Sequence, residues 1–122
     1  LSYTTFAYSD LEVSPLRQRT QGEYTVKVNV TNTGKRAGDE VVQLYVRDKV
    51  SSVITYDSQL RGFERISLKP GETRQVTFSL KPEDLQILDR NMNWTVEPGE
   101  FEVMIGASSQ DIRLKKTITA LP

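Results

Sequence analysis

Carboxylate side chains are the residues of this sequence whose types and spacing could support catalysis. Two carboxyl groups held about 5 to 9 Å apart are enough to hydrolyse a glycosidic bond. The candidates are the neighbours Asp39 and Glu40, the neighbours Glu83 and Asp84, and the cluster Glu97, Glu100 and Glu102. Nearly all of them fall in predicted turns or on the polar faces of predicted strands, where an acid is solvated and its pKa is not raised. We therefore expect no catalytic residue in this chain.

Two residue types are absent, and their absence excludes other chemistry. The 122-residue sequence contains no Cys and no His. Without Cys there is no disulfide, no thiolate nucleophile and no cysteine-metal site. Without His there is no Ser-His or Cys-His nucleophile system and no imidazole base near neutral pH.

The charge balance bears on partners rather than on catalysis. Sixteen Lys and Arg residues are matched by sixteen Asp and Glu residues. Neither nucleic acid nor an anionic membrane surface is therefore an expected partner, because each requires a basic face. No stretch approaches the ~20 apolar residues of a transmembrane helix.

The stretch from Asp89 to Glu100 partly matches a calcium-binding loop. The first, third, fifth and twelfth positions of such a loop would be Asp89, Asn91, Asn93 and Glu100. However, the sixth position is Trp94, where the sharp turn of a calcium loop requires Gly. The pair Pro98-Gly99 also explains the stretch as a hairpin. We therefore predict no metal site and no cofactor site.

Aromatic rings could instead bind sugars by stacking on them. The candidates are Tyr8, Tyr45, Tyr56 and Trp94, and they lie on four separate segments. A sandwich that binds polysaccharide usually presents two or three coplanar rings, so this scatter makes a glycan platform the less favoured hypothesis. The alternation of Trp94 with Val96 predicts that Trp94 lies in the core or contacts a neighbouring domain.

The elements that would position these side chains are predicted to be strands. Apolar residues alternate with polar ones over residues 24–31, 76–80 and 101–105, which is typical of half-buried antiparallel strands. Residues 40–47 are apolar on both sides, which indicates a central strand or one whose outer face meets a neighbour. Weaker or shorter strands are expected at 60–66, 87–88, 94–96 and 112–118, a single helical turn at 82–85, and a long loop at 48–58.

This pattern predicts an all-β fold. It gives roughly seven or eight strands with turns about every ten residues and no long helix, which is typical of an antiparallel β-sandwich of the fibronectin type III or immunoglobulin-like kind. The immunoglobulin disulfide and tyrosine corner are missing, which favours the fibronectin-like variant. The length corresponds to a single domain with one core.

A family resemblance adds to this reading. Residues 32–46, NTGKRAGDEVVQLYV, closely resemble the fibronectin type III-like domain that closes many glycoside hydrolase family 3 enzymes. Residues 60–65, 68–73 and 94–109 agree with the same family in the same order, and residues 1–6 resemble the linker that enters such a domain. We therefore divide the chain into residues 1–10, a linker and first strand entering from an upstream domain, and residues 11–122, the fibronectin type III-like domain.

The resemblance also implies a parent enzyme. Such a parent is a retaining β-glucosidase or a related exo-β-glycosidase, built from a TIM-barrel domain, an α/β sandwich domain and this module. Its Asp nucleophile and Glu acid/base would both lie upstream, and its location would be periplasmic or extracellular. Many relatives carry Pro in the loop before the Leu-x-Gly-Phe strand, whereas this chain has Tyr56 there, so the path of the loop is left open.

The leading hypothesis is a non-catalytic structural module that docks on the catalytic domains of the same polypeptide and stabilises them. The candidate interface residues are the loop 48–58 with Tyr56, Arg61, Phe63, Arg90 and Trp94. The alternative is a carbohydrate-binding module that contributes to polysaccharide attachment.

Overall fold

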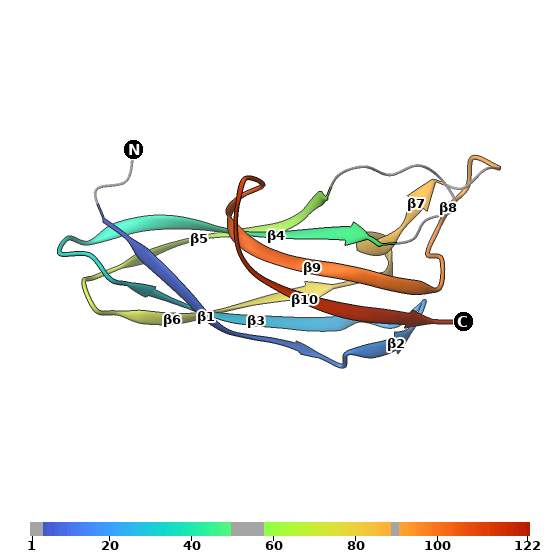
Figure 1. The fold of residues 1–122 in the computed structure, drawn as a ribbon, viewed down its shortest axis with the longest axis horizontal. Helices are drawn as coiled ribbons and strands as arrows, with labels where there is room; N and C mark the ends of the chain where they lie inside the picture. Colours follow the sequence, from blue (N-terminus) through green and yellow to red (C-terminus); the bar gives the residue numbers. More distant parts are fainter. Residues whose placement is uncertain (1–3, 50–57, 89–90) are drawn as a thin grey trace.

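The chain folds as a β-sandwich in the computed structural model, which describes residues 4–49, 58–88 and 91–122 (Figure 1). Seven strands of eight or more residues form it: β1 (Phe6–Ser14), β3 (Tyr24–Asn32), β4 (Gly38–Asp48), β5 (Gln59–Leu68), β6 (Thr73–Leu80), β9 (Gly99–Ser108) and β10 (Asp111–Leu121). The shorter elements are β2 (Arg17–Arg19), β7 (Ile87–Leu88), β8 (Trp94–Thr95) and the 3₁₀ helix η1 (Pro82–Leu85). The predicted all-β sandwich and the helical turn at 82–85 are confirmed. The described part of the chain contains no helix with the length and apolar character needed to cross a membrane.

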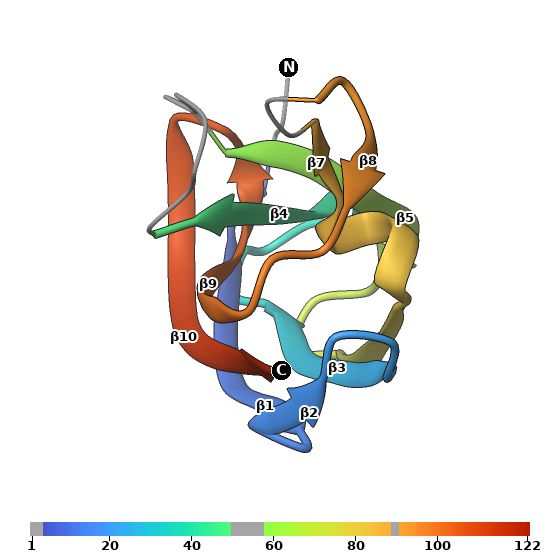
Figure 2. The same ribbon diagram turned by 90° about the vertical axis from the view of Figure 1, so that its right-hand side faces the viewer.

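Two sheets form the layers of the sandwich. One has three strands in the order β1-β3-β6, and the other has five in the order β2-β10-β9-β4-β5. Figure 2 shows β1 and β3 below β4 and β5. Buried residues of both sheets form one hydrophobic core. The hairpin of β7 and β8 forms a small sheet of its own at the end of the sandwich where β4 ends. β1 begins at one end of the long axis and β10 ends at the other (Figure 1).

Alternation along the strands explains which side chains form the core. Successive side chains of a strand point to opposite faces of its sheet. On β3 the inward side chains Tyr24, Val26, Val28 and Val30 are all fully buried. The five-stranded sheet contributes the buried residues Val42, Leu44, Phe101, Val103 and Ile105. Because burial of each large apolar side chain contributes about 1.5–3 kcal/mol, this interior is the main source of stability.

β1 crosses the predicted division of the chain at residues 10 and 11. Phe6 and Val13, near its two ends, are both buried in the core. The strand pairs with β3 from Phe6 opposite Asn32 to Ser14 opposite Thr25, with an irregularity between Ser9 and Glu12. In the described part of the chain, residues on both sides of the division thus belong to one sandwich, and the division itself stays a prediction about a longer polypeptide.

Asn32 is the only polar side chain among the described residues that is fully buried. Its side-chain NH₂ donates hydrogen bonds to the backbone carbonyls of Arg36 (2.8 Å) and Leu68 (3.0 Å). Its Oδ1 accepts hydrogen bonds from the backbone N–H of Gly34 (2.9 Å) and the hydroxyl of Thr4 (2.7 Å). Both donors and both acceptor positions of the amide are thereby satisfied. Asn32 therefore joins three segments that are far apart in the sequence.

Candidate functional site

The outer face of the three-stranded sheet is polar. The outward pairs of β3 and β6 are Thr25 with Ser79, Lys27 with Thr77, Asn29 with Gln75, and Thr31 with Thr73. All eight residues have polar or charged side chains. A sheet that faces water on one side presents such residues there. This face has the character of a permanently solvated surface.

The outer face of the five-stranded sheet is apolar where β4 and β5 pair. Phe63 lies opposite Gln43 and is 68% exposed, and Leu60 lies opposite Tyr45 and is 47% exposed. Val41, on the same side of β4, is also exposed. We call Val41, Leu60 and Phe63 the apolar patch. Exposed apolar side chains gathered on one face mark an interaction surface more often than isolated ones do.

The apolar character continues from the patch into the middle of the sheet. Tyr45 is only 9% exposed and lies opposite Met104 of β9, which is also buried. Both residues lie on the outer side of the sheet and do not belong to the core cluster. The Tyr45 hydroxyl donates a hydrogen bond to Oε1 of Gln43. Its ring is therefore not available to stack on a sugar, which rules out one of the four predicted stacking candidates.

A second exposed apolar group lies on the hairpin of β7 and β8. Trp94 is 65% exposed and Met92 is exposed as well. The prediction that Trp94 could lie in the core is wrong. β8 ends at Thr95, so the alternation of a strand does not extend from Trp94 to the buried Val96. Figures 1 and 2 show the hairpin on the side of β4 and β5 away from β3. The other prediction for Trp94, contact with a neighbouring domain, stays a prediction.

Arg61 lies beside the apolar patch at an irregularity of β5. Leu44 is opposite Gly62 and Tyr45 is opposite Leu60, so Arg61 is an extra residue between them, as in a β-bulge. Its Nε is buried and has no hydrogen-bond partner within the described part of the chain. Leaving a buried donor unsatisfied costs on the order of 1–3 kcal/mol.

The predicted interface residues are thus partly brought together. Arg61 and Phe63 lie two residues apart on β5, whereas Trp94 lies on the separate hairpin. Tyr56, Arg90 and most of the loop 48–58 lie outside the described residues. Val41 and Leu60 were not among the predicted interface residues. The signal for Val41 was the two-sided apolar pattern of residues 40–47, which is unusual for a strand with a solvated outer face.

The neighbouring carboxylates Asp39 and Glu40, which were considered for catalysis, have structural partners. Asp39 accepts hydrogen bonds from the hydroxyl of Ser67 (2.6 Å) and the guanidinium of Arg65 (2.7 Å). These contacts, the Ser67 hydroxyl first, lower the pKa of Asp39. Glu40 accepts a hydrogen bond from the Tyr8 hydroxyl at 2.9 Å. Asp39 is therefore a poor general acid, because that role needs a raised pKa.

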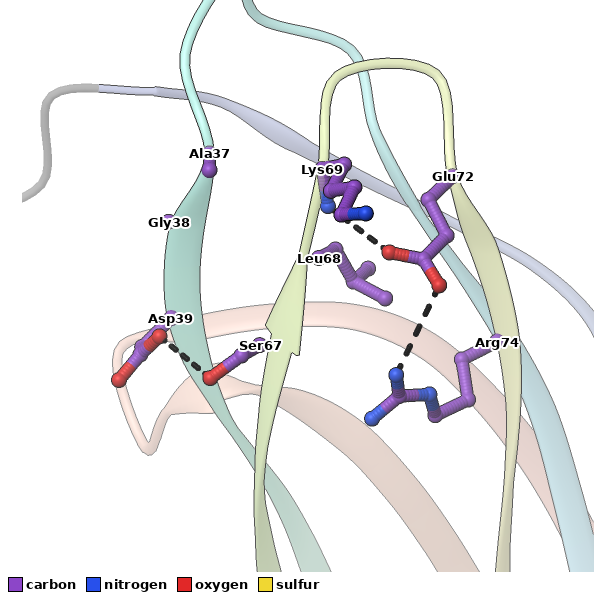
Figure 3. Close-up of a pocket in the computed structure, with 8 residues that line it drawn as sticks. All are labelled: Ala37, Gly38, Asp39, Ser67, Leu68, Lys69, Glu72 and Arg74. Carbon is purple, nitrogen blue, oxygen red and sulfur yellow. Dashed lines mark hydrogen bonds and ion pairs between the residues drawn. The ribbon is translucent and has the colours of Figure 1, made fainter.

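A hollow of about 450 Å³ opens between the start of β4 and the turn that joins β5 to β6. It is lined by Ala37, Gly38, Asp39, Ser67, Leu68, Lys69, Glu72 and Arg74 (Figure 3). Its carboxylates already have partners, since Glu72 accepts from the Lys69 backbone N–H (2.8 Å) and pairs with Arg74 (3.7 Å). The lining residues include no aromatic ring. The hollow therefore offers a sugar neither a stacking surface nor an unpaired carboxylate.

Metal binding finds no geometric support in the described residues. Among them, no group of three or more acidic side chains could hold an ion. The candidate calcium loop begins at Asp89, which lies outside the described part of the chain.

The chain is similar to a known domain family and to part of several glycosidases. A family model for the "Fibronectin type III-like domain" matches residues 40–109. The chain is 50% identical over 115 residues to a β-xylosidase of Formosa agariphila, covering 94% of this chain and 16% of that protein. It is 43% identical over 113 residues to the periplasmic β-glucosidase of Salmonella typhimurium, covering 93% and 15%. A solved β-glucosidase structure from Erythrobacter marinus matches with a TM-score of 0.92 at 40% identity, covering 99% of this chain and 16% of that one. The chain thus spans about a sixth of the length of these relatives.

Proposed function

Because the chain belongs to the fibronectin type III-like domain family and corresponds to one domain of glycoside hydrolase family 3 enzymes, we propose that it is a non-catalytic accessory module. In this proposal the module docks on the catalytic domains of its own polypeptide and stabilises them. The docking surface is the outer face of β4 and β5, with the apolar patch at its centre.

The contrast between the two outer faces of the sandwich carries this proposal. The face of β3 and β6 has eight polar outward residues, whereas the face of β4 and β5 exposes Val41, Leu60 and Phe63. Covering exposed apolar surface yields about 25 cal/mol per Å². More than four fifths of each relative's length lies outside the matched region. We therefore take the rest of the same polypeptide as the partner that covers this face.

The same relatives support a proposal for the activity of the longer polypeptide. We propose that it is an exo-glycosidase that removes terminal β-linked glucose or a related sugar with retention. The catalytic Asp and Glu would both belong to the rest of the polypeptide. A periplasmic or extracellular location is supported by the relative named a periplasmic β-glucosidase.

Paired substitutions in the longer polypeptide test the docking proposal. Leu60→Ser with Phe63→Ser should lower its melting temperature by several degrees and reduce its soluble yield, because the partner surface loses its apolar cover. The same pair should change the isolated chain little, since both side chains are exposed there. The matched control is Lys27→Ser with Thr77→Ser on the polar face, which should leave both proteins unchanged. Docking through this face is excluded if the patch variant and the control behave alike in the longer polypeptide.

One observation favours the alternative of a carbohydrate-binding module. Trp94 is exposed on its hairpin, where its ring could stack on a sugar. Among the other candidates, Tyr45 is buried on the outer sheet face. A single ring gives a weaker platform than the coplanar pair such a module usually presents. We therefore rank this function second.

A further inference from the structure

Arg61 differs from the arginines of the structure that have acidic partners. Arg47 pairs with Glu102, Arg65 with Asp39, Arg74 with Glu72, and Arg113 with Asp111. Within the described residues, Arg61 forms no such pair, and its buried Nε donates no hydrogen bond. An arginine guanidinium has five N–H donors and no acceptor, so it can be satisfied only by oxygen atoms or water.

The surroundings of Arg61 on β5 are apolar. Leu60 precedes it, Phe63 follows two residues later, and Tyr45 of β4 lies opposite Leu60. The Tyr45 hydroxyl is already used on Gln43. The bulge at residue 61 therefore places a cation between two exposed apolar side chains, Leu60 and Phe63. The other cation of this region, Arg65 opposite Val41, is already paired with Asp39. Bulges of this kind commonly redirect a side chain toward a functional contact.

A partner that covers the patch would also reduce the contact of the guanidinium with water. Burying a cation without an opposite charge is strongly unfavourable, whereas a carboxylate can accept two parallel N–H bonds from a guanidinium. Arginine is accordingly enriched among the residues that dominate binding at interfaces. The chemistry of the site thus calls for an acidic group on the partner surface, surrounded by apolar atoms.

We propose that Arg61 is the polar anchor of the docking surface and receives an Asp or Glu carboxylate from the rest of the same polypeptide. This inference rests on the proposed docking function. The apolar patch supplies buried area, and Arg61 fixes the register of the two surfaces through a directional ion pair. The acidic partner residue lies outside this chain.

The test compares the same substitution in two contexts. Arg61→Met keeps the length of the side chain and removes its charge and donors. In the isolated chain it should leave the melting temperature unchanged or raise it, because an unsatisfied buried donor disappears. In the longer polypeptide it should lower the melting temperature, because the partner carboxylate is then buried without its cation. Arg61→Lys should recover only part of this loss, since an ammonium cannot form the paired contact.

The control is Arg74→Met on β6, which removes an exposed ion pair and should have the same small effect in both contexts. Equal destabilisation of the isolated chain and the longer polypeptide by Arg61→Met would assign Arg61 to the sandwich itself and overturn the proposal. No change in the longer polypeptide would overturn it as well. If Leu60→Ser with Phe63→Ser still weakens the longer polypeptide in that case, docking stands without the anchor. If neither variant has an effect, the docking function fails too.

Discussion

The hydroxyl of Thr4 donates a 2.7 Å hydrogen bond to Oδ1 of Asn32, the buried amide at the end of β3. Thr4 also packs closely against Gly34, since a Cβ added at Gly34 would lie 1.8 Å from Oγ1 of Thr4. The next residue is held too, because the N–H of Thr33 donates to the carbonyl of Thr5 at 2.9 Å. The segment before β1 is thus fastened to the turn between β3 and β4.

Gly34→Ala should displace Thr4 while leaving the Asn32 side chain in place. We expect the free energy of unfolding to fall by about 1–3 kcal/mol, the usual effect of overpacking. Amide hydrogen exchange at Thr33 should become faster, because its acceptor on Thr5 moves away. The comparison variant is Gly22→Ala, where the atoms nearest an added Cβ belong to Gln18 and not to Thr4, so exchange at Thr33 should stay unchanged. Unchanged exchange at Thr33 would show that the segment is not held in this way.

Because of Tyr8, the free energy of unfolding should depend on pH in the alkaline range. Burial, and then the charge of Glu40 that accepts its hydrogen bond, raise the pKa of Tyr8 well above the usual value. The unfolded chain loses this proton near pH 10 while the folded chain retains it. The stabilisation is therefore complete below about pH 10 and is lost as pH rises further.

Urea unfolding between about pH 9 and pH 11 measures this effect. We expect the free energy of unfolding to decrease less steeply in Tyr8→Phe than in the wild type. The free energy of unfolding of the variant should still decrease somewhat at alkaline pH, because burial also raises the pKa of Tyr24. Identical slopes in the two proteins would contradict the assignment to Tyr8.

Trp94 offers a spectroscopic test of the hairpin, because it is the only tryptophan in the sequence. In the isolated chain its emission should resemble that of tryptophan in water and be quenched readily by acrylamide. Trp94→Phe should change the free energy of unfolding of the isolated chain by less than about 0.5 kcal/mol. In the longer polypeptide, subtracting the emission spectrum of Trp94→Phe from that of the wild type isolates the fluorescence of Trp94. This fluorescence should be blue-shifted and protected from quenching by acrylamide. A fully quenchable Trp94 there would remove the hairpin from the interface.

Glycan binding separates the two candidate functions. We expect the isolated chain to give no heat of binding with cello-oligosaccharides, xylan or soluble β-glucan in calorimetry. It should also leave an aryl-β-glucoside unhydrolysed. Binding that disappears in Trp94→Ala but persists in Tyr45→Phe would favour the carbohydrate-binding module. Hydrolysis by the isolated chain would contradict the assignment of catalysis to the rest of the polypeptide.

The strands were predictable wherever a single sheet face is buried. The alternation of residues 24–31 identified the buried side of β3, because each inward position there is a large apolar residue. The two-sided apolar pattern of residues 40–47 predicted a central strand or one whose outer face meets a neighbour, and β4 indeed lies between β9 and β5. Such patterns record local periodicity, which the sandwich preserves in its long strands.

Features that depend on distant segments were not predictable. The burial of Asn32 was not predicted, because it depends on the carbonyls of Arg36 and Leu68 that accept hydrogen bonds from its amide. The bulge at Arg61 depends on the pairing register of β4 and β5, which no local pattern specifies. The prediction of a core position for Trp94 was wrong because the two-residue length of β8 cannot be read from alternation.

The placement of the first and last long strands has a mechanical consequence. β1 begins at one end of the long axis and β10 ends at the other (Figure 1). A force applied at those two points would act along both strands rather than across them. The ladder bonds of β1 with β3 and of β10 with β9 would then be loaded together in shear instead of being peeled apart one by one. Under tension the module would behave as a stiff connector whose resistance is set by its unfolding rate.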